Sequence, residues 1–272
     1  MPCNKKAKRL LLPFYYRAKK IAFIPYRMLF WVRAKTSITK RLDYAPSRIS
    51  LVVESHRELH TRLHSAAKEP ETVAWIEQTF SSGDVLYDIG ANIGAYSLIT
   101  GAAHNGTVKV YAFEPGFQNF NNLCRNIINN KQTEHIVPVQ IAFSDKTEMH
   151  NFNYYDFKSG SALHTLHPEH NVKKRTPIWK QPMLCYALDD FIATFGVPHP
   201  SHLKIDVDGS EAEIISGARE TIRNRQLKSL LIESTEQVMR HIVPILNASG
   251  FTEQSRHNRG GETYNYIFTR SR

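Results

Sequence analysis

The chain has 272 residues, of which 42% are hydrophobic, and this is enough to bury the core of one large domain. Its formal net charge of +10 is concentrated in residues 1–48, which hold thirteen Lys and Arg against one acid, whereas the remainder holds 22 basic and 24 acidic residues. This distribution excludes a domain that is basic throughout. The chain has three cysteines without Cys-x-x-Cys spacing, which argues against a disulfide framework or a zinc site and favours a cytoplasmic location.

Residues 1–64 are predicted to form a basic, aromatic-rich and partly helical arm. Lysine pairs at 5–6 and 19–20 alternate with bulky aromatic residues, and no run approaches the roughly 18 apolar residues of a membrane span. Arg17 and its neighbours also interrupt any apolar core of a secretory signal. We expect the arm to bind an anionic membrane surface from the cytoplasmic side, with an oligomer contact or a helical cap as alternatives. Nucleic acid is the lesser alternative, because the domain that follows is slightly acidic.

A domain is expected over residues 65–272, beginning with a helix at 65–80. The next stretch predicts a buried strand at 85–89, a turn and the start of a helix. Glycines at 90 and 94 let the backbone of this turn approach a ligand closely. A dinucleotide fingerprint starting at Gly90 would need glycine at the positions held by Asn92 and Ala95, so a cofactor other than NAD is favoured.

A second strand at 107–113 leads to Glu114, which lies twenty positions beyond the second glycine of the turn. A carboxylate there suits a ribose diol, because it accepts two O–H hydrogen bonds. An amphipathic helix to residue 129 follows, and then a third strand at 136–143. Ser144 would lie near an adenine ring bound across the same sheet edge.

An inserted loop is expected at about 156–181. It carries His164, His167 and His170 at a spacing of three, followed by a basic run at 173–175. Pro168 interrupts the helix that would bring the three imidazoles together, so we expect a mobile, cationic substrate loop and not a metal cluster.

The C-terminal third continues the alternation of strands and helices. A buried strand at 202–207 contains Asp206 at its end, Ser210 is placed to cap the next helix, and a strand at 230–232 ends at Glu233. Segments at 251–255 and 264–269 are expected to form a closing antiparallel hairpin. The pattern predicts a doubly wound α/β sheet that binds ligands at the carboxyl ends of its strands.

Six motifs in one order carry a family resemblance. They are Asp-Ile-Gly-Ala-Asn-Ile-Gly at 88–94, Ala-Phe-Glu-Pro at 112–115, Ile-Ala-Phe-Ser-Asp at 141–145, Leu-Asp-Asp-Phe at 188–191, Leu-Lys-Ile-Asp-Val-Asp-Gly-Ser-Glu at 203–211 and Ile-Glu at 232–233. The set resembles the FkbM family of S-adenosylmethionine-dependent methyltransferases over roughly residues 69–235. Asp208 departs from the glutamate that the family commonly shows there.

The resemblance implies a Rossmann-like class I methyltransferase fold with a seven-stranded, mostly parallel sheet and a C-terminal antiparallel hairpin. It implies methyl transfer from S-adenosylmethionine to an oxygen of a sugar, glycan or glycolipid-type acceptor, as in polysaccharide biosynthesis. Its cofactor positions fall on Asp88, Gly90, Ala91, Asn92, Gly94, Glu114, Pro115, Phe143, Ser144 and Asp206.

For a hydroxyl acceptor a general base assists the transfer, and Asp206 is the first candidate, with His164 the second. Asp206 and Glu233, at the ends of adjacent strands, would be the pair to hold a divalent cation, although no metal is predicted. The alternatives to a sugar methyltransferase are an RNA or small-metabolite methyltransferase, a nicotinamide oxidoreductase, and a non-catalytic nucleoside-binding module recruited by the arm. The sequence leaves the oligomeric state open.

Overall fold

The structure is a computed structural model that describes residues 28, 38–162, 164–166 and 176–270. The chain divides into two units, Met1–Ile38 and Thr39–Arg272, and every element named below belongs to the second. Most of the expected arm, two of the three loop histidines and the basic run at 173–175 lie outside the described residues. In the described part, no helix is both long and apolar enough to cross a membrane.

The second unit begins before the expected boundary at residue 65. Strands β1 (Thr39–Arg41) and β2 (Ser50–Val52) pair antiparallel. Five side chains from residues 39–64 enter the core of the unit, namely Leu42, Tyr44, Ile49, Leu51 and Leu63. Because these residues bury apolar surface against the domain, the segment from 39 to 64 is part of it.

The helix expected at 65–80 is two helices, α4 (Ser65–Lys68) and α5 (Pro70–Thr79). Pro70 has no N–H to continue a helix and restrains the residue before it to non-helical conformations, so the break falls at Glu69. The preceding helix α3 (His56–His60) begins at a capping box in which Ser55 and Glu58 bond each other's backbone N–H groups.

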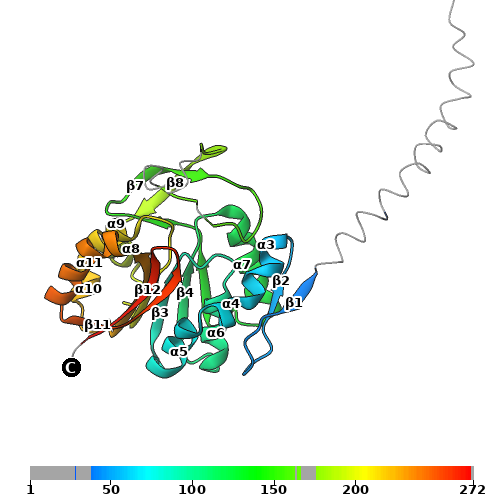
Figure 1. The fold of residues 1–272 in the computed structure, drawn as a ribbon, viewed down its shortest axis with the longest axis horizontal. Coiled ribbons are helices and arrows are strands. Elements are labelled where there is room, and N and C mark those ends of the chain that lie inside the picture. Colours follow the sequence, from blue (N-terminus) through cyan, green and yellow to red (C-terminus); the bar gives the residue numbers. More distant parts are fainter. Residues whose placement is uncertain (1–27, 29–37, 163, 167–175, 271–272) are drawn as a thin grey trace, which may run out of the picture. The chain divides into compact units, whose positions relative to one another are not determined.

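Seven strands form the central sheet, in the order β11-β12-β10-β9-β3-β4-β5 (Figure 1). Their bounds are β3 Val85–Ile89, β4 Lys109–Phe113, β5 Ile136–Val139, β9 His202–Ile205, β10 Ser229–Thr235, β11 Phe251–Gly260 and β12 Thr263–Arg270. All pairings are parallel except those of β12, which is antiparallel to both neighbours. The predicted mostly parallel sheet with a C-terminal hairpin is confirmed.

Helices cover both faces of this sheet (Figure 1). Along β3, Leu86 faces one core, whereas Tyr87 and Ile89 face the other, as the alternation of a strand requires. The first core is covered by α5, α6 (Ala95–Ala103) and α7 (Phe117–Asn129). The second is covered by α8 (Leu188–Phe195), α9 (Glu211–Ser216), α10 (Arg219–Arg223) and α11 (Glu236–Ala248).

The chain runs from β3 to β4 and β5 on one side and then crosses to β9 on the other. This reversal of strand order beside β3 opens a crevice at the carboxyl ends of the strands, where open α/β sheets bind ligands.

The strand expected at 136–143 is divided. Its first half is β5, and its second half, β6 (Ala142–Phe143), belongs to a separate three-stranded sheet with β8 (Trp179–Tyr186) and β7 (Glu148–Tyr154). This small sheet stands beyond the carboxyl ends of the central strands (Figure 1). Phe143 therefore approaches the crevice from the small sheet and not from the central one.

Two further expectations about local structure need correction. Ser210 precedes α9 but makes no capping hydrogen bond with its side chain, whereas Thr235 caps α11 by accepting from the N–H of Val238. The first hairpin strand also continues past residue 255 to Gly260. This extension carries Arg259 to the edge of the crevice.

Candidate active site

A cleft lies at the carboxyl ends of the central strands. Its floor comes from the ends of β3, β4, β9 and β10, and the segment from α3 to α4 and the small sheet contribute its walls. Residues expected from the sequence to serve the site and found lining the cleft are Gly90, Asn92, Glu114, Pro115, Phe143, His164 and Asp206. Four others do not line it, namely Asp88, Ala91, Gly94 and Ser144.

The glycine turn after β3 needs both of its glycines. Gly90 has a φ of +84°, and a Cβ built on it would lie 1.9 Å from the carbonyl oxygen of Asp206. Gly94 has a φ of +88°, and its Cβ would lie 2.5 Å from a methyl group of Leu123 on α7. The turn is therefore packed against the end of β9 on one side and against α7 on the other.

Glu114, directly after β4, fixes this turn from the neighbouring strand. Its Oε2 accepts from the N–H of Asn92 at 2.9 Å, and its Oε1 accepts from the N–H of Gly116 at 2.8 Å. Burial raises the pKa of Glu114 to about 7, although these hydrogen bonds oppose the shift. Oε1 also accepts from the amide of Asn119 at 3.5 Å, so Oε2 is the oxygen that keeps a lone pair for a ligand hydroxyl in the cleft.

Asp206 and Asp88 share a buried cation. The Nζ of Lys204 lies 2.8 Å from Oδ2 of Asp206 and 3.6 Å from Oδ1 of Asp88. Burial alone would raise the pKa of Asp206, but the ammonium group holds it below its usual range. Burial likewise opposes the charge of Lys204, yet the surrounding carboxylates raise its pKa, so the lysine stays protonated.

Asp88 is enclosed behind the turn. Its Oδ2 accepts from the hydroxyl of Ser97 at 2.6 Å, and the residue is 1% exposed. Its carboxylate faces Lys204 and Ser97, where it connects β3 to β9 and α6.

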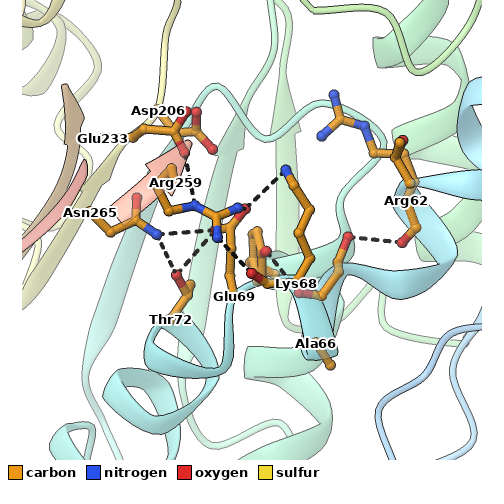
Figure 2. A network of polar contacts seen from close by, with 12 residues as sticks. Arg62, Ala66, Lys68, Glu69, Thr72, Asp206, Glu233, Arg259 and Asn265 are labelled. Atoms are coloured by element: carbon orange, nitrogen blue, oxygen red, sulfur yellow. Dashed lines mark hydrogen bonds and ion pairs between the residues drawn. The ribbon is translucent and has the colours of Figure 1, made fainter. Parts of the chain in front are cut away.

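Glu233, at the end of β10, faces the cleft beside Asp206. The negative charge of Asp206, followed by burial, raises the pKa of Glu233 to about 8. Figure 2 shows Arg259 between Glu69 on one side and Asp206 and Glu233 on the other. The guanidinium group of Arg259 contacts Oε1 of Glu69 at 2.7 Å. The Nε of Arg259 lies 3.6 Å from Oε2 of Glu233. The hairpin strand β11 thereby ties the end of β10 to the break between α4 and α5.

His164 reaches the cleft from the inserted loop. Its Nδ1 is 3.3 Å from the N–H of Tyr155, and burial lowers its pKa to about 4. The contact favours the neutral tautomer with its proton on Nε2. A ring in this state donates a hydrogen bond to a ligand and is a poor base.

Several cleft residues were not found by sequence reasoning. Arg57, Arg62, Lys68 and Glu69 line the cleft from the segment before the first motif, and no local pattern marks them. Lys204 had a weak signal, because it stands two positions before Asp206 on one strand and so shares its face. No group of three or more His, Cys, Asp or Glu among the described residues is placed to hold a metal ion.

Comparison with known proteins assigns the class and the family. A crystal structure of methyltransferase FkbM from Methylobacillus flagellatus superposes with a TM-score of 0.51 at 16% identity, over 70% of this chain and 44% of that chain. The strand order and this likeness show a Rossmann-like fold. The methyltransferase FkbM domain model matches residues 88–253, more than half of the chain. The protein belongs to the FkbM methyltransferase family.

Two methyltransferases are similar to this chain over most of their length. Hexuronic acid methyltransferase AglP of Haloferax volcanii is 22% identical over 209 residues, which cover 76% of this chain and 79% of the relative. The 31-O-demethyl-FK506 methyltransferase FkbM of Streptomyces tacrolimicus is 27% identical over 196 residues, covering 62% of this chain and 73% of the relative.

Proposed function

We propose that the protein transfers a methyl group from S-adenosylmethionine to a hydroxyl group of a sugar or glycan acceptor. The observation that carries the proposal is the junction of Glu114, the glycine turn and Asp206 in one cleft. The family supplies the reaction class, and this junction supplies positions for a donor and for a reacting hydroxyl.

The residues present fit the donor. Glu114 offers a carboxylate for the ribose diol, while Ile141, Phe143 and Ile214 provide apolar walls for an adenine ring beside it. The packed glycine turn leaves no side chain at position 90 between the backbone and the ligand. S-adenosylmethionine, when bound, supplies an electrophilic methyl group on its sulfonium.

The chain's task is then to place and deprotonate the acceptor hydroxyl. As the C–O bond forms and the C–S bond breaks, the hydroxyl proton becomes strongly acidic, so even a carboxylate of lowered pKa accepts it. The ion pair with Lys204 keeps the carboxyl group of Asp206 charged, so Asp206 suits the role of proton acceptor. The neutral His164 suits hydrogen-bond donation to the acceptor.

The sugar acceptor is supported by the hexuronic acid methyltransferase among the similar proteins. Asp206 and Glu233 support this assignment, since their carboxyl oxygens can accept hydrogen bonds from sugar hydroxyl groups in the cleft.

Titration calorimetry on the full chain with S-adenosylmethionine and with NAD tests the donor. We expect the first to bind and the second not to bind, and Glu114→Ala to weaken donor binding by at least about tenfold. Failure of the wild-type protein to bind S-adenosylmethionine would contradict the proposal. The acceptor class is tested by mass spectrometry of sugars incubated with protein and donor.

For the basic arm we propose contact with an anionic membrane, which its composition supports. Cosedimentation with vesicles that contain anionic lipid tests this, with neutral vesicles as the control. Replacing the lysines at 5–6 and 19–20 by glutamine should lower binding. Unchanged binding by that variant would contradict the proposal.

A further inference from the structure

The two sides of the cleft differ in hydrogen-bonding character. The strand ends contribute carboxyl groups, whereas the segment from α3 to α4 contributes Arg57, Arg62 and Lys68. Figure 2 shows the cationic ends of Arg62 and Lys68 pointing away from the helices that carry them. Glu69, at the end of this segment, pairs with Lys68 at 3.4 Å, so Arg57 and Arg62 are the cations that this second wall offers to a ligand.

The cationic wall is firmly positioned. Arg62 donates through Nε and Nη2 to the carbonyl of Gly160, at 3.3 and 3.1 Å. The fully buried Glu58 accepts from the hydroxyl of Ser159 at 2.6 Å and from the amide of Asn122 at 2.9 Å. These contacts hold α3, which carries Arg57, against both the inserted loop and α7, and the bonds to Gly160 hold the side chain of Arg62.

A buried hydroxyl next to this wall has no partner. Ser161 lines the cleft, is 1% exposed, and its Oγ makes no hydrogen bond within the described part of the chain. Its carbonyl is held by the amides of Asn92 and Asn119, both at 3.0 Å, so the backbone beside the hydroxyl is fixed. A buried hydroxyl left without a bond is unfavourable, which points to a ligand atom as its partner.

The groups on this side are therefore mainly donors. The guanidinium groups of Arg57 and Arg62 and the Nε2–H of His164 donate, and the hydroxyl of Ser161 is able to donate. A neutral sugar hydroxyl would satisfy only part of such a set, whereas a carboxylate or phosphate accepts several hydrogen bonds and compensates the charge.

We propose that Arg57, Arg62 and Ser161 bind an anionic group on the acceptor, so that the preferred acceptor is a sugar acid or a sugar phosphate. The proposal rests on the proposed function, because it assigns the acceptor side of the same cleft. It places the anion at the α3–α4 wall and a neighbouring hydroxyl at Asp206. The three side chains determine specificity and take no part in the methyl transfer.

Binding of sugars to the full chain loaded with S-adenosylhomocysteine tests the proposal. The probes are D-glucuronate, D-glucose 6-phosphate and D-glucose, measured by saturation-transfer NMR and calorimetry. We expect at least one anionic probe to bind at least about tenfold more tightly than glucose. Arg57→Gln should lower that affinity about tenfold and leave glucose unaffected, and Arg62→Lys should retain more of it than Arg62→Gln. The matched control is Arg223→Gln on α10, whose arginine is exposed and pairs with Glu220.

Equal affinities for the three probes, or no binding of any, would overturn the proposal. A rival assignment gives the arginines to the amino-acid carboxylate of the donor. In that case Arg57→Gln and Arg62→Gln would weaken S-adenosylhomocysteine but not methylthioadenosine, which lacks that carboxylate, and the proposal would be wrong. S-adenosylhomocysteine is also titrated alone into the wild-type protein. Failure of this titration would contradict the proposed function, and it is thereby distinguished from failure of the sugar probes to bind.

Discussion

Lys204 and Asp206 are two residues apart on β9 and form an ion pair of 2.8 Å at the floor of the cleft. The side chain of Lys204 is 2% exposed, and it also faces the enclosed carboxylate of Asp88. One buried cation therefore compensates two carboxylates, one lining the cleft and one behind it. This arrangement fixes the charge state of Asp206 without using a group from the ligand.

Replacing Lys204 by methionine should destabilise the protein strongly. Removing one partner of a buried ion pair typically costs about 3–5 kcal/mol, because the remaining charge is left uncompensated. Urea denaturation measures the loss, and Lys109→Met on β4, whose ammonium group bonds the carbonyl of Glu134 at the surface, is the control. The double variant with Asp88→Asn should lose less than the sum of the two single variants. Strict additivity would show that Asp88 is not coupled to the lysine.

Glu211, at the start of α9, should make the folded state less stable as the pH rises. Burial raises its pKa to about 8, although the N–H of Gly209 donates to its Oε1 at 3.1 Å. Because the folded pKa lies above the unfolded value of about 4.5, its contribution is fully present below that pH and is lost as the pH rises towards 8. Glu211→Gln should therefore raise stability at pH 8 by the order of a few kcal/mol and have little effect at pH 4.5.

Thermal unfolding at a series of pH values measures this difference. The control is Glu220→Gln, which makes the same substitution at an exposed glutamate on α10. If Glu211→Gln shifts stability equally at both ends of the range, the carboxyl group does not titrate as described.

Much of the site was predictable because its signals are local. The glycine turn, Glu114 and Asp206 each follow directly from a buried strand, and parallel strands bring their carboxyl ends to one edge. Sequence alone therefore placed these groups together. It also predicted the sheet, since five of the strands read as short apolar runs separated by helices.

The remainder of the site depends on tertiary packing. The segment that carries Arg57 and Arg62 is held at the cleft by Glu58 of α3, which bonds Asn122 on α7 and Ser159 in the inserted loop. These contacts join residues far apart in the sequence, so no local pattern predicts them. Asp88 was expected at the cofactor from its motif position, but its carboxylate is directed to Lys204 and Ser97. Its assignment to the cofactor site stays a prediction.

Gly90→Ala should be far more damaging than the same change at Gly83. Both glycines have positive φ, at +84° and +87°, so both variants incur a similar left-handed backbone cost of roughly 1–2 kcal/mol. A Cβ at residue 83 has no atom within 4 Å, whereas one at residue 90 meets the main-chain oxygen of Asp206 at 1.9 Å. We expect the clash to add about 1–3 kcal/mol and to weaken donor binding. Denaturant unfolding and calorimetry measure the two effects, and equal stability losses would contradict the close packing of the turn.

Asp206→Asn and His164→Gln should separate the two candidates for the base. Asparagine keeps the shape of Asp206 but takes no proton, so methyl transfer should fall by about 10²–10⁴ in kcat. Glutamine at 164 keeps an N–H donor, and because the imidazole is neutral with Nδ1 occupied by Tyr155, its replacement should lower kcat only slightly. Single-turnover transfer to a sugar acid measures both rates, with calorimetry confirming that each variant still binds the donor. A large loss in His164→Gln with near-normal activity in Asp206→Asn would reverse the assignment, because the proton would then leave through the loop and not through the end of β9.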